Sequence, residues 1–221
     1  MITFFELDCG GETVTIEKTD DGDFIFHGWD EETELAAIEL GFEPSDCFAL
    51  WSAINDDRLN DALMEQARDG NAFLAEALIL AGASTKAKSE SFTGRTALHD
   101  AAANGNADVA KVLLKAGASV DARARNGDTP LHSAVLCDQA NVVQILLDAG
   151  ASLDATDPGE RTPLHLAILD GHPDVVQILL DAGASVSAVD KWGRTPLNIS
   201  NQYFYADVDA ILKDWIREHG I

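Results

Sequence analysis

The sequence predicts a mainly α-helical solenoid of repeated helix-turn-helix units, with a small α+β unit at its N-terminal end. Two short strings predict the solenoid, because both recur with the same period. Threonines in RTALH, DTPLH, RTPLH and RTPLN are 33 residues apart, at Thr96, Thr129, Thr162 and Thr195. The string AGAS begins at residues 81, 116, 149 and 182, at intervals of 35, 33 and 33. Because two different strings recur with the same period, the sequence indicates a single repeated structural unit.

Residues 1–58 differ in kind from the repeats. They contain sixteen acidic residues against Lys18 and Arg58, and so hold most of the excess negative charge of the chain. They also contain eight of its fifteen aromatic residues, which favours a folded element over an acidic tail. TVTIEK (13–18) and DFIFH (23–27) alternate apolar and polar residues around a turn-forming Asp-Asp-Gly, and this pattern predicts a β-hairpin.

Two helices are expected after the hairpin. EETELAAIEL (31–40) begins with acidic residues, as the helix dipole favours, and ends at Gly41. PSDCFALWSAI (44–54) is expected to form a further helix that leads into the repeats. A unit of fewer than 60 residues gains stability by packing on a neighbour, so this segment is expected to cap the solenoid. Its acidic surface either binds a partner or only keeps an exposed end soluble.

The residues of one repeat specify two helices and a projecting hairpin. Thr162 can cap free N–H groups, and proline at the first helical position loses no hydrogen bond. Apolar residues at helical spacing follow, and Gly171 can end this first helix in a left-handed conformation. PDVVQILLD (173–181) predicts the second helix, and SVSAVDKWGR (185–194) predicts an extended hairpin with a turn.

The TPLH string, the helix-turn-helix pattern and the period of 33 together resemble the ankyrin repeat family. The resemblance covers roughly residues 59–219 and divides the chain into an N-terminal unit, 1–58, and a solenoid, 59–221. The expected repeats are 59–93, 94–126, 127–159, 160–192 and 193–221. The first and last repeats lack parts of the motif and are expected to act as caps.

Two turns depart from the family pattern. Asp138 stands where glycine is expected between the two helices of the third repeat. Glu160 lies beside a displaced Gly159 in the hairpin of the fourth. Both turns are therefore expected to differ locally in backbone geometry.

The charge balance favours a basic protein as the partner. The chain has 38 acidic and 15 basic residues and a formal net charge of −23, so it repels nucleic acid and anionic membranes. Cys9, Cys47 and Cys137 are widely separated and predict free thiols in a reducing compartment. No signal-like N-terminus or long apolar run is present, so a cytoplasmic location is expected. Export without a cleaved signal stays open.

No cofactor, metal site or catalytic centre is expected. His99, His132 and His165 recur every 33 residues, but stacked repeats would separate them by about 10 Å, whereas zinc binds its ligands at about 2 Å. The family resemblance implies that these histidines form hydrogen bonds within and between repeats. The turn TDDGD (19–23) does not match a calcium-binding loop, because Gly28 falls at the glutamate position. Catalytic motifs are absent from the sequence.

The resemblance places Trp192 at the tip of a hairpin, and the family usually binds proteins with these tips and the adjoining concave face. Trp192 is the strongest binding candidate, because tryptophan often dominates interface energetics. The alternative is that its ring folds back over a neighbouring hairpin. The same positional argument selects Phe92, Arg125, Asp128, Glu160, Asp170, Arg194 and Tyr203. The acidic turn adds Asp20, Asp21 and Asp23.

The resulting hypothesis is a non-catalytic protein-binding module, monomeric when unbound, that masks a basic partner. One concrete form is an immunity or inhibitor protein directed against a basic toxin or nuclease. The first rival is a scaffold or effector adaptor that bridges two proteins. The second rival makes the N-terminal segment a catalytic fragment, which the absence of a nucleophile–base signature disfavours.

Overall fold

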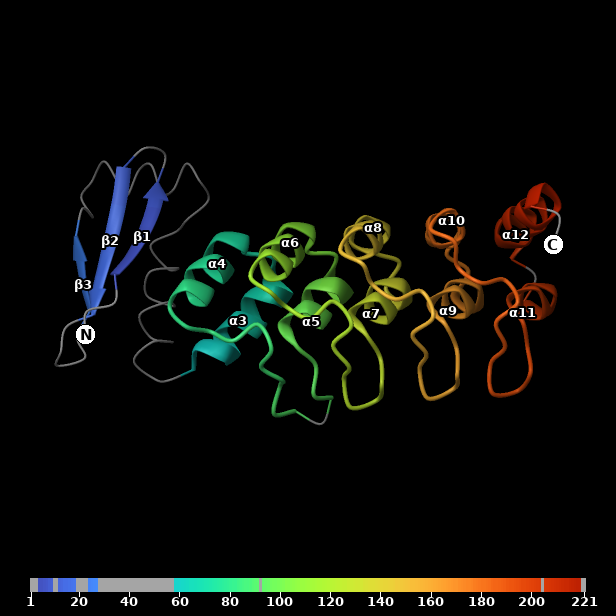
Figure 1. Ribbon diagram of the computed structural model, residues 1–221, viewed down its shortest axis with the longest axis horizontal. Helices are drawn as coiled ribbons and strands as arrows, with labels where there is room; N and C mark the ends of the chain where they lie inside the picture. The colour runs from blue at the N-terminus through green and yellow to red at the C-terminus, as the bar shows by residue number, and fades with distance from the viewer. Residues whose placement is uncertain are drawn as a thin grey trace.

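The computed structural model describes residues 4–9, 12–18, 24–27, 58–91, 93–203 and 205–219. Within them, ten helices form two parallel rows, which confirms the predicted helical solenoid (Figure 1). The first row holds α3 (Leu59–Asp69), α5 (Ala97–Asn104), α7 (Pro130–Leu136), α9 (Pro163–Asp170) and α11 (Pro196–Tyr203). The second row holds α4 (Ala72–Leu80), α6 (Ala107–Lys115), α8 (Ala140–Asp148), α10 (Pro173–Asp181) and α12 (Ala206–His219). None of the described helices is long and apolar enough to cross a membrane.

The recurring threonine and histidine begin the first helix of each central repeat. At the start of α7, the Thr129 N–H donates to His132 Nδ1 at 3.3 Å, and Thr129 Oγ1 accepts the His132 N–H at 3.4 Å. The reciprocal pair satisfies two backbone donors that a helix start leaves free. In α11, Asn198 stands in the histidine position, and its Oδ1 accepts the Thr195 N–H at 3.1 Å. Asparagine can therefore supply this cap.

The core repeats with the same period as the sequence. Leu98, Leu131 and Leu164 are fully buried and come from successive first-row helices. A second buried set, one residue from each of α6, α8 and α10, comprises Leu113, Leu146 and Leu179. Each repeat buries its apolar face against its neighbours, so the helices share one continuous core.

The two departures from the family pattern are left-handed turns. Asp138 has φ +55° and Glu160 has φ +58°. The positions equivalent to Asp138 are Gly105 at +74° and Gly171 at +76°. Side chains other than glycine are strained in this region, so both residues keep the turn at a cost in stability.

Asp138→Gly is expected to raise the free energy of unfolding by about 1 kcal/mol, because glycine adopts positive φ without strain. Urea denaturation monitored by circular dichroism would measure it. Asp138→Ala is the matched control, since it removes the carboxylate but keeps the strained Cβ. Equal stabilisation by alanine would show that charge, and not backbone strain, is the cause.

The N-terminal segment contains a three-stranded antiparallel sheet in the order β1 (Phe4–Cys9), β2 (Glu12–Lys18) and β3 (Phe24–His27). Phe4 pairs with Glu17, and Lys18 pairs with Phe24. The sequence interpretation did not include β1. The turn at residues 19–23 and the helices expected at 31–40 and 44–54 lie outside the described residues. Packing of this segment as a cap on the solenoid therefore stays a prediction.

Candidate protein-binding surface

Four hairpins project from the first row of helices (Figure 1). They are named here hairpin 1 (84–95), hairpin 2 (119–128), hairpin 3 (152–161) and hairpin 4 (185–194). Backbone hydrogen bonds join neighbours: the Arg125 N–H donates to the Thr93 carbonyl at 2.8 Å, and the Lys191 N–H donates to the Gly159 carbonyl at 3.0 Å. Between hairpins 2 and 3 the equivalent residue is Pro158, which has no N–H to donate.

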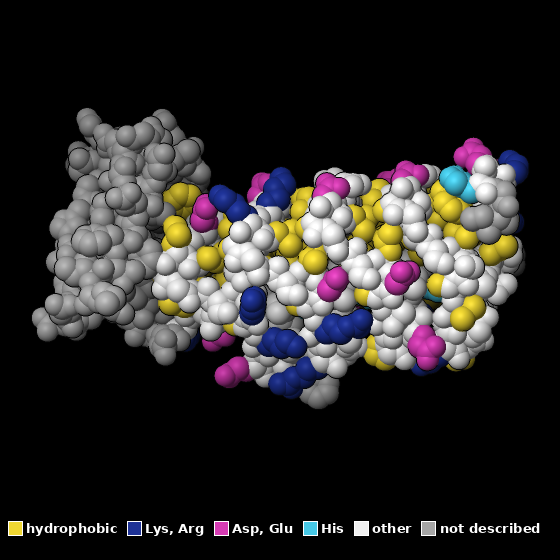
Figure 2. Space-filling view, viewed as in Figure 1, with side chains coloured by type: hydrophobic (Ala, Val, Ile, Leu, Met, Phe, Trp, Pro, Cys, Tyr) yellow, Lys and Arg dark blue, Asp and Glu magenta, His cyan; other side chains and the backbone are white. Residues whose placement is uncertain are grey.

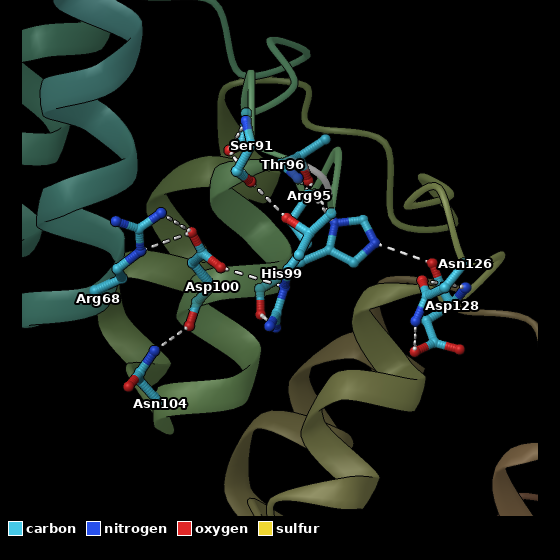
Figure 3. A network of polar contacts seen from close by, with 11 residues as sticks. Arg68, Ser91, Arg95, Thr96, His99, Asp100, Asn104, Asn126 and Asp128 are labelled. Atoms are coloured by element: carbon cyan, nitrogen blue, oxygen red, sulfur yellow. Dashed lines mark hydrogen bonds and ion pairs between the residues drawn. The ribbon is translucent and has the colours of Figure 1, made fainter.

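The buried histidines connect each first-row helix to the following hairpin. His99 Nε2 lies 3.1 Å from the Asp128 carbonyl, as Figure 3 shows, and His165 Nε2 lies 3.2 Å from the Arg194 carbonyl. The equivalent contact of His132 is with the backbone of Arg161, where its buried Nε2 does not reach ordinary hydrogen-bond geometry. This weaker contact falls at the junction that contains Pro158, so hairpins 2 and 3 lack the backbone hydrogen bond that joins the other neighbouring hairpins.

The histidines are structural elements of the solenoid. Burial lowers the pKa of His99, His132 and His165 below the ordinary value of 6.5, so the rings are neutral near pH 7. The part of the chain that the structure describes contains no cluster of side chains that could hold a metal ion.

A buried aspartate organises each of hairpins 3 and 4. The Asp157 carboxylate accepts the Arg161 Nε–H at 2.7 Å, and the Asp190 carboxylate accepts the Arg194 Nε–H at 2.8 Å. Asp190 also accepts the N–H groups of Trp192 and Arg194, both at 2.9 Å. Burial opposes ionisation of both carboxylates, but these hydrogen bonds outweigh it and lower the pKa of each aspartate.

Trp192 lies at the tip of hairpin 4 with 58% of its surface exposed. Two cations contact its ring: Lys191 Nζ is 4.4 Å and Arg194 Cζ is 4.8 Å from the ring centroid. Such contacts contribute about 0.5–1 kcal/mol at exposed sites. Trp192 is therefore exposed at a tip whose backbone bonds to Asp190, and two cations lie over its ring.

The other candidate residues occupy different environments. Arg125, Glu160, Asp170 and Tyr203 are exposed. Asp128 and Arg194 are half-buried, and Arg194 is bound to Asp190. Phe92, Asp20, Asp21 and Asp23 lie outside the described residues.

A groove runs between the hairpins and the C-terminal ends of the first-row helices. Its first hollow, of about 440 Å³, is lined by residues that include Arg95, Arg125 and Leu136. Its second hollow, of about 290 Å³, is lined by residues that include Leu136, Arg161 and Trp192. The hollows share Asn126, Asp128 and Leu136, so the groove extends from hairpin 1 to hairpin 4.

Sequence reasoning missed Leu136, which joins the two hollows and is 41% exposed at the end of α7. The adjacent Cys137 is also exposed and lines the first hollow. Position 136 is one period after Ala103 and one before Leu169, so alignment of the repeats could have indicated a variable apolar position there.

A charged network holds the first hairpin to the helices beside it (Figure 3). The buried Asp100 carboxylate lies 2.9 Å from Arg68 NH2 and 3.3 Å from Arg95 Nε. Arg95 also donates to the His99 carbonyl at 3.0 Å. The Arg95 guanidinium therefore serves the fold, although it lines the first hollow.

Stacked helix pairs, a shared core and projecting hairpins define a repeat solenoid, a class of protein in which each repeat contacts only its neighbours. Models of "ankyrin repeats (3 copies)" and "ankyrin repeats (many copies)" match residues 63–157 and 146–200, which together span more than half of the chain. The chain belongs to the ankyrin repeat family, which generally serves as a non-catalytic protein interaction module. A comparison with curated proteins finds no match.

Proposed function

We propose that the chain masks a basic partner protein, which it binds through the hairpin tips and groove while its acidic charge accelerates encounter. The observation that carries this proposal is Trp192, an exposed aromatic ring at the end of the groove. Preorganised aromatic residues dominate binding energy at many interfaces, because little conformational freedom is lost when they are covered.

The sign of the partner's charge follows from the net charge of −23. Complementary charge raises association rates, whereas buried aromatic contacts mainly slow dissociation. An immunity or inhibitor protein that occupies the substrate groove of a toxin or nuclease is one form of this proposal. A monomeric state and a cytoplasmic location belong to it too, and the free Cys137 thiol supports a reducing compartment.

The test begins with a pull-down from the native host, using the wild-type chain beside Trp192→Ala and a deletion of residues 1–55. One basic partner, lost in both variants, is the expected result. Affinity for that partner should also fall steeply as salt rises from about 50 to about 500 mM. Affinity that hardly changes over this range would contradict the electrostatic part of the proposal.

Trp192→Ala is expected to weaken binding of that partner at least about 30-fold, mainly through faster dissociation, because truncating a hot-spot tryptophan removes about 2 kcal/mol or more. Val189→Ala is the matched control, since Val189 is 54% exposed in the same hairpin but does not line either hollow. Surface plasmon resonance would measure both rates. Equal losses in the two variants would show that Trp192 has no special role.

A second candidate is a scaffold that bridges two proteins. The observation in its favour is that the exposed cations of hairpins 1 and 2 are opposite in sign to the net charge of the chain. Deleting residues 1–55 would then remove one of two partners and leave the other bound.

A further inference from the structure

We propose that the groove beside hairpins 1 and 2 binds an extended acidic peptide segment of a partner protein, with one bulky apolar side chain seated on Leu136. This inference rests on the protein-binding role of the repeats, and it goes beyond the proposed masking of a basic partner. The acidic ligand is opposite in charge to the proposed basic partner. It occupies the end of the groove that is farther from Trp192.

Four exposed cations occupy the first two hairpins: Lys86, Lys88, Arg123 and Arg125. The hairpins adjoin, because Lys88 Nζ donates to the Arg123 carbonyl at 2.8 Å and the Arg125 N–H donates to the Thr93 carbonyl at 2.8 Å. Lys and Arg side chains gather over the hairpins below α5 and α7 in Figure 2. This surface, named here the basic patch, is a concentrated positive region on a strongly acidic chain.

The four cations of the basic patch outnumber the carboxylates of the same two hairpins, which are Glu90, Asp121 and Asp128. Lys88 and Arg123 donate to backbone carbonyls, and none of the four cations forms an ion pair within the described part of the chain. The arginines bound to Asp157 and Asp190 in hairpins 3 and 4 occupy another position of the repeat, which Arg95 holds in hairpin 1 and Asp128 in hairpin 2. Ser91 and Ala124 stand in the positions of Asp157 and Asp190, so hairpins 1 and 2 lack the buried carboxylate that organises the other two hairpins. The patch therefore retains its charge for a ligand.

The first hollow supplies the apolar half of the site. Arg125, Asn126 and Asp128 line it on the hairpin side, where Asn126 Nδ2 donates to the Asp128 carboxylate at 2.6 Å, and Ala103 and Leu136 line it on the helix side. Its volume of about 440 Å³ accommodates one large side chain with adjoining backbone. Cations beside an apolar surface match a segment in which carboxylates flank a leucine or an aromatic residue.

Nucleic acid matches this surface less well. A polyanion would gain from the patch but would be repelled by the net charge of −23, and it has no need of the apolar floor. An acidic peptide needs only a few carboxylates, so most of the repulsion is avoided and the apolar contact adds to binding.

Fluorescence anisotropy with synthetic peptides tests the proposal on the full chain. The probe is a fluorescein-labelled ten-residue peptide of glutamate and aspartate with a central Leu-Phe pair. Two comparison peptides replace the pair by Gly-Ser or the acidic residues by lysine. We expect saturable binding of the acidic Leu-Phe peptide, at least tenfold weaker binding of the Gly-Ser peptide, and no saturable binding of the lysine peptide at this groove.

Two substitutions locate the site, each with a matched control elsewhere on the surface. Arg125→Glu should weaken the acidic peptide at least tenfold, whereas Lys111→Glu on α6 makes the same charge change and should alter affinity less than threefold. Leu136→Ala should weaken it at least fivefold, whereas Leu80→Ala removes a comparably exposed leucine (49%, against 41% for Leu136) outside the groove and should have little effect. Circular dichroism melting would verify that all four variants fold.

Several outcomes would overturn the proposal. Equal losses of peptide affinity in Arg125→Glu and Lys111→Glu would indicate long-range attraction only. Equal affinity for the Gly-Ser and Leu-Phe peptides would show that the apolar contact does not contribute to binding. Tighter binding of single-stranded DNA would assign the patch to nucleic acid. Trp192→Ala should leave peptide affinity within about twofold, so failure of the basic-partner proposal and failure of this one are separable.

Discussion

The free energy of unfolding is expected to fall as the pH is lowered from about 7 through the ordinary histidine pKa of 6.5, because the three buried histidines are neutral in the folded chain. Burial lowers their folded pKa, whereas the unfolded chain keeps the ordinary value. Between these two pKa values the unfolded chain binds more protons than the folded chain. Each histidine therefore lowers the free energy of unfolding by up to about 1.4 kcal/mol for each unit by which the pH falls. Urea denaturation from pH 8 to pH 5 would measure the decline.

Asparagine provides the control, because Asn198 already supplies the same helix cap in α11. His132→Asn should reduce the pH dependence by the contribution of one histidine, and it should also lower stability near pH 8, because His132 is fully buried whereas Asn198 is exposed. His99→Asn should reduce it similarly but lose the bond to the Asp128 carbonyl. A wild-type chain with constant stability from pH 8 to pH 5 would contradict the buried neutral state. The carboxylates of Asp157 and Asp190 titrate below this range, because their pKa lies under 3.8.

The solenoid could be predicted from sequence because its signals are local. Thr162, Pro163 and Gly171 mark the start and end of α9 within ten residues, and the structure places all three at those positions. The other repeats contain the same kinds of start and end signals, which strengthens the prediction. Local signals of this kind agree with the final packing, since each repeat contacts only its neighbours.

The groove could not be predicted because it depends on how repeats stack. Leu136 and Ala103 line the first hollow from successive repeats, and no single repeat contains both residues. The positive charge of hairpins 1 and 2 was likewise not predicted from the sequence. Net charge suggested a uniformly acidic surface, but Asp157 and Asp190 are committed to their own hairpins, whereas Arg125 is exposed without such a partner in the described residues.

The position of Trp192 was predictable from the repeat period, but its contacts were not. Neither the cation contacts nor the hydrogen bond to Asp190 follows from spacing alone. Asp190 is the buried residue that holds the tip, so its removal is expected to have one of the largest effects in the solenoid.

Asp190→Ala is expected to lower the free energy of unfolding by about 2–3 kcal/mol. Removing one member of a buried ion pair costs about 3–5 kcal/mol, and the loss is smaller here because Arg194 can still reach water. Two backbone N–H groups also lose their acceptor. Asp154→Ala is the matched control, since Asp154 is an exposed hairpin aspartate and should change stability by less than about 0.5 kcal/mol.

Hydrogen exchange distinguishes loss of the tip from general destabilisation. In Asp190→Ala the amides of Trp192 and Arg194 should exchange at least tenfold faster relative to core amides such as that of Leu164, because their acceptor is gone. Asp157→Ala should be similarly unstable but should accelerate the Gly159 and Arg161 amides instead. Only Asp190→Ala should then reproduce the binding loss of Trp192→Ala. Uniform acceleration of all amides in both variants would mean that the aspartates stabilise the repeats without positioning the tips.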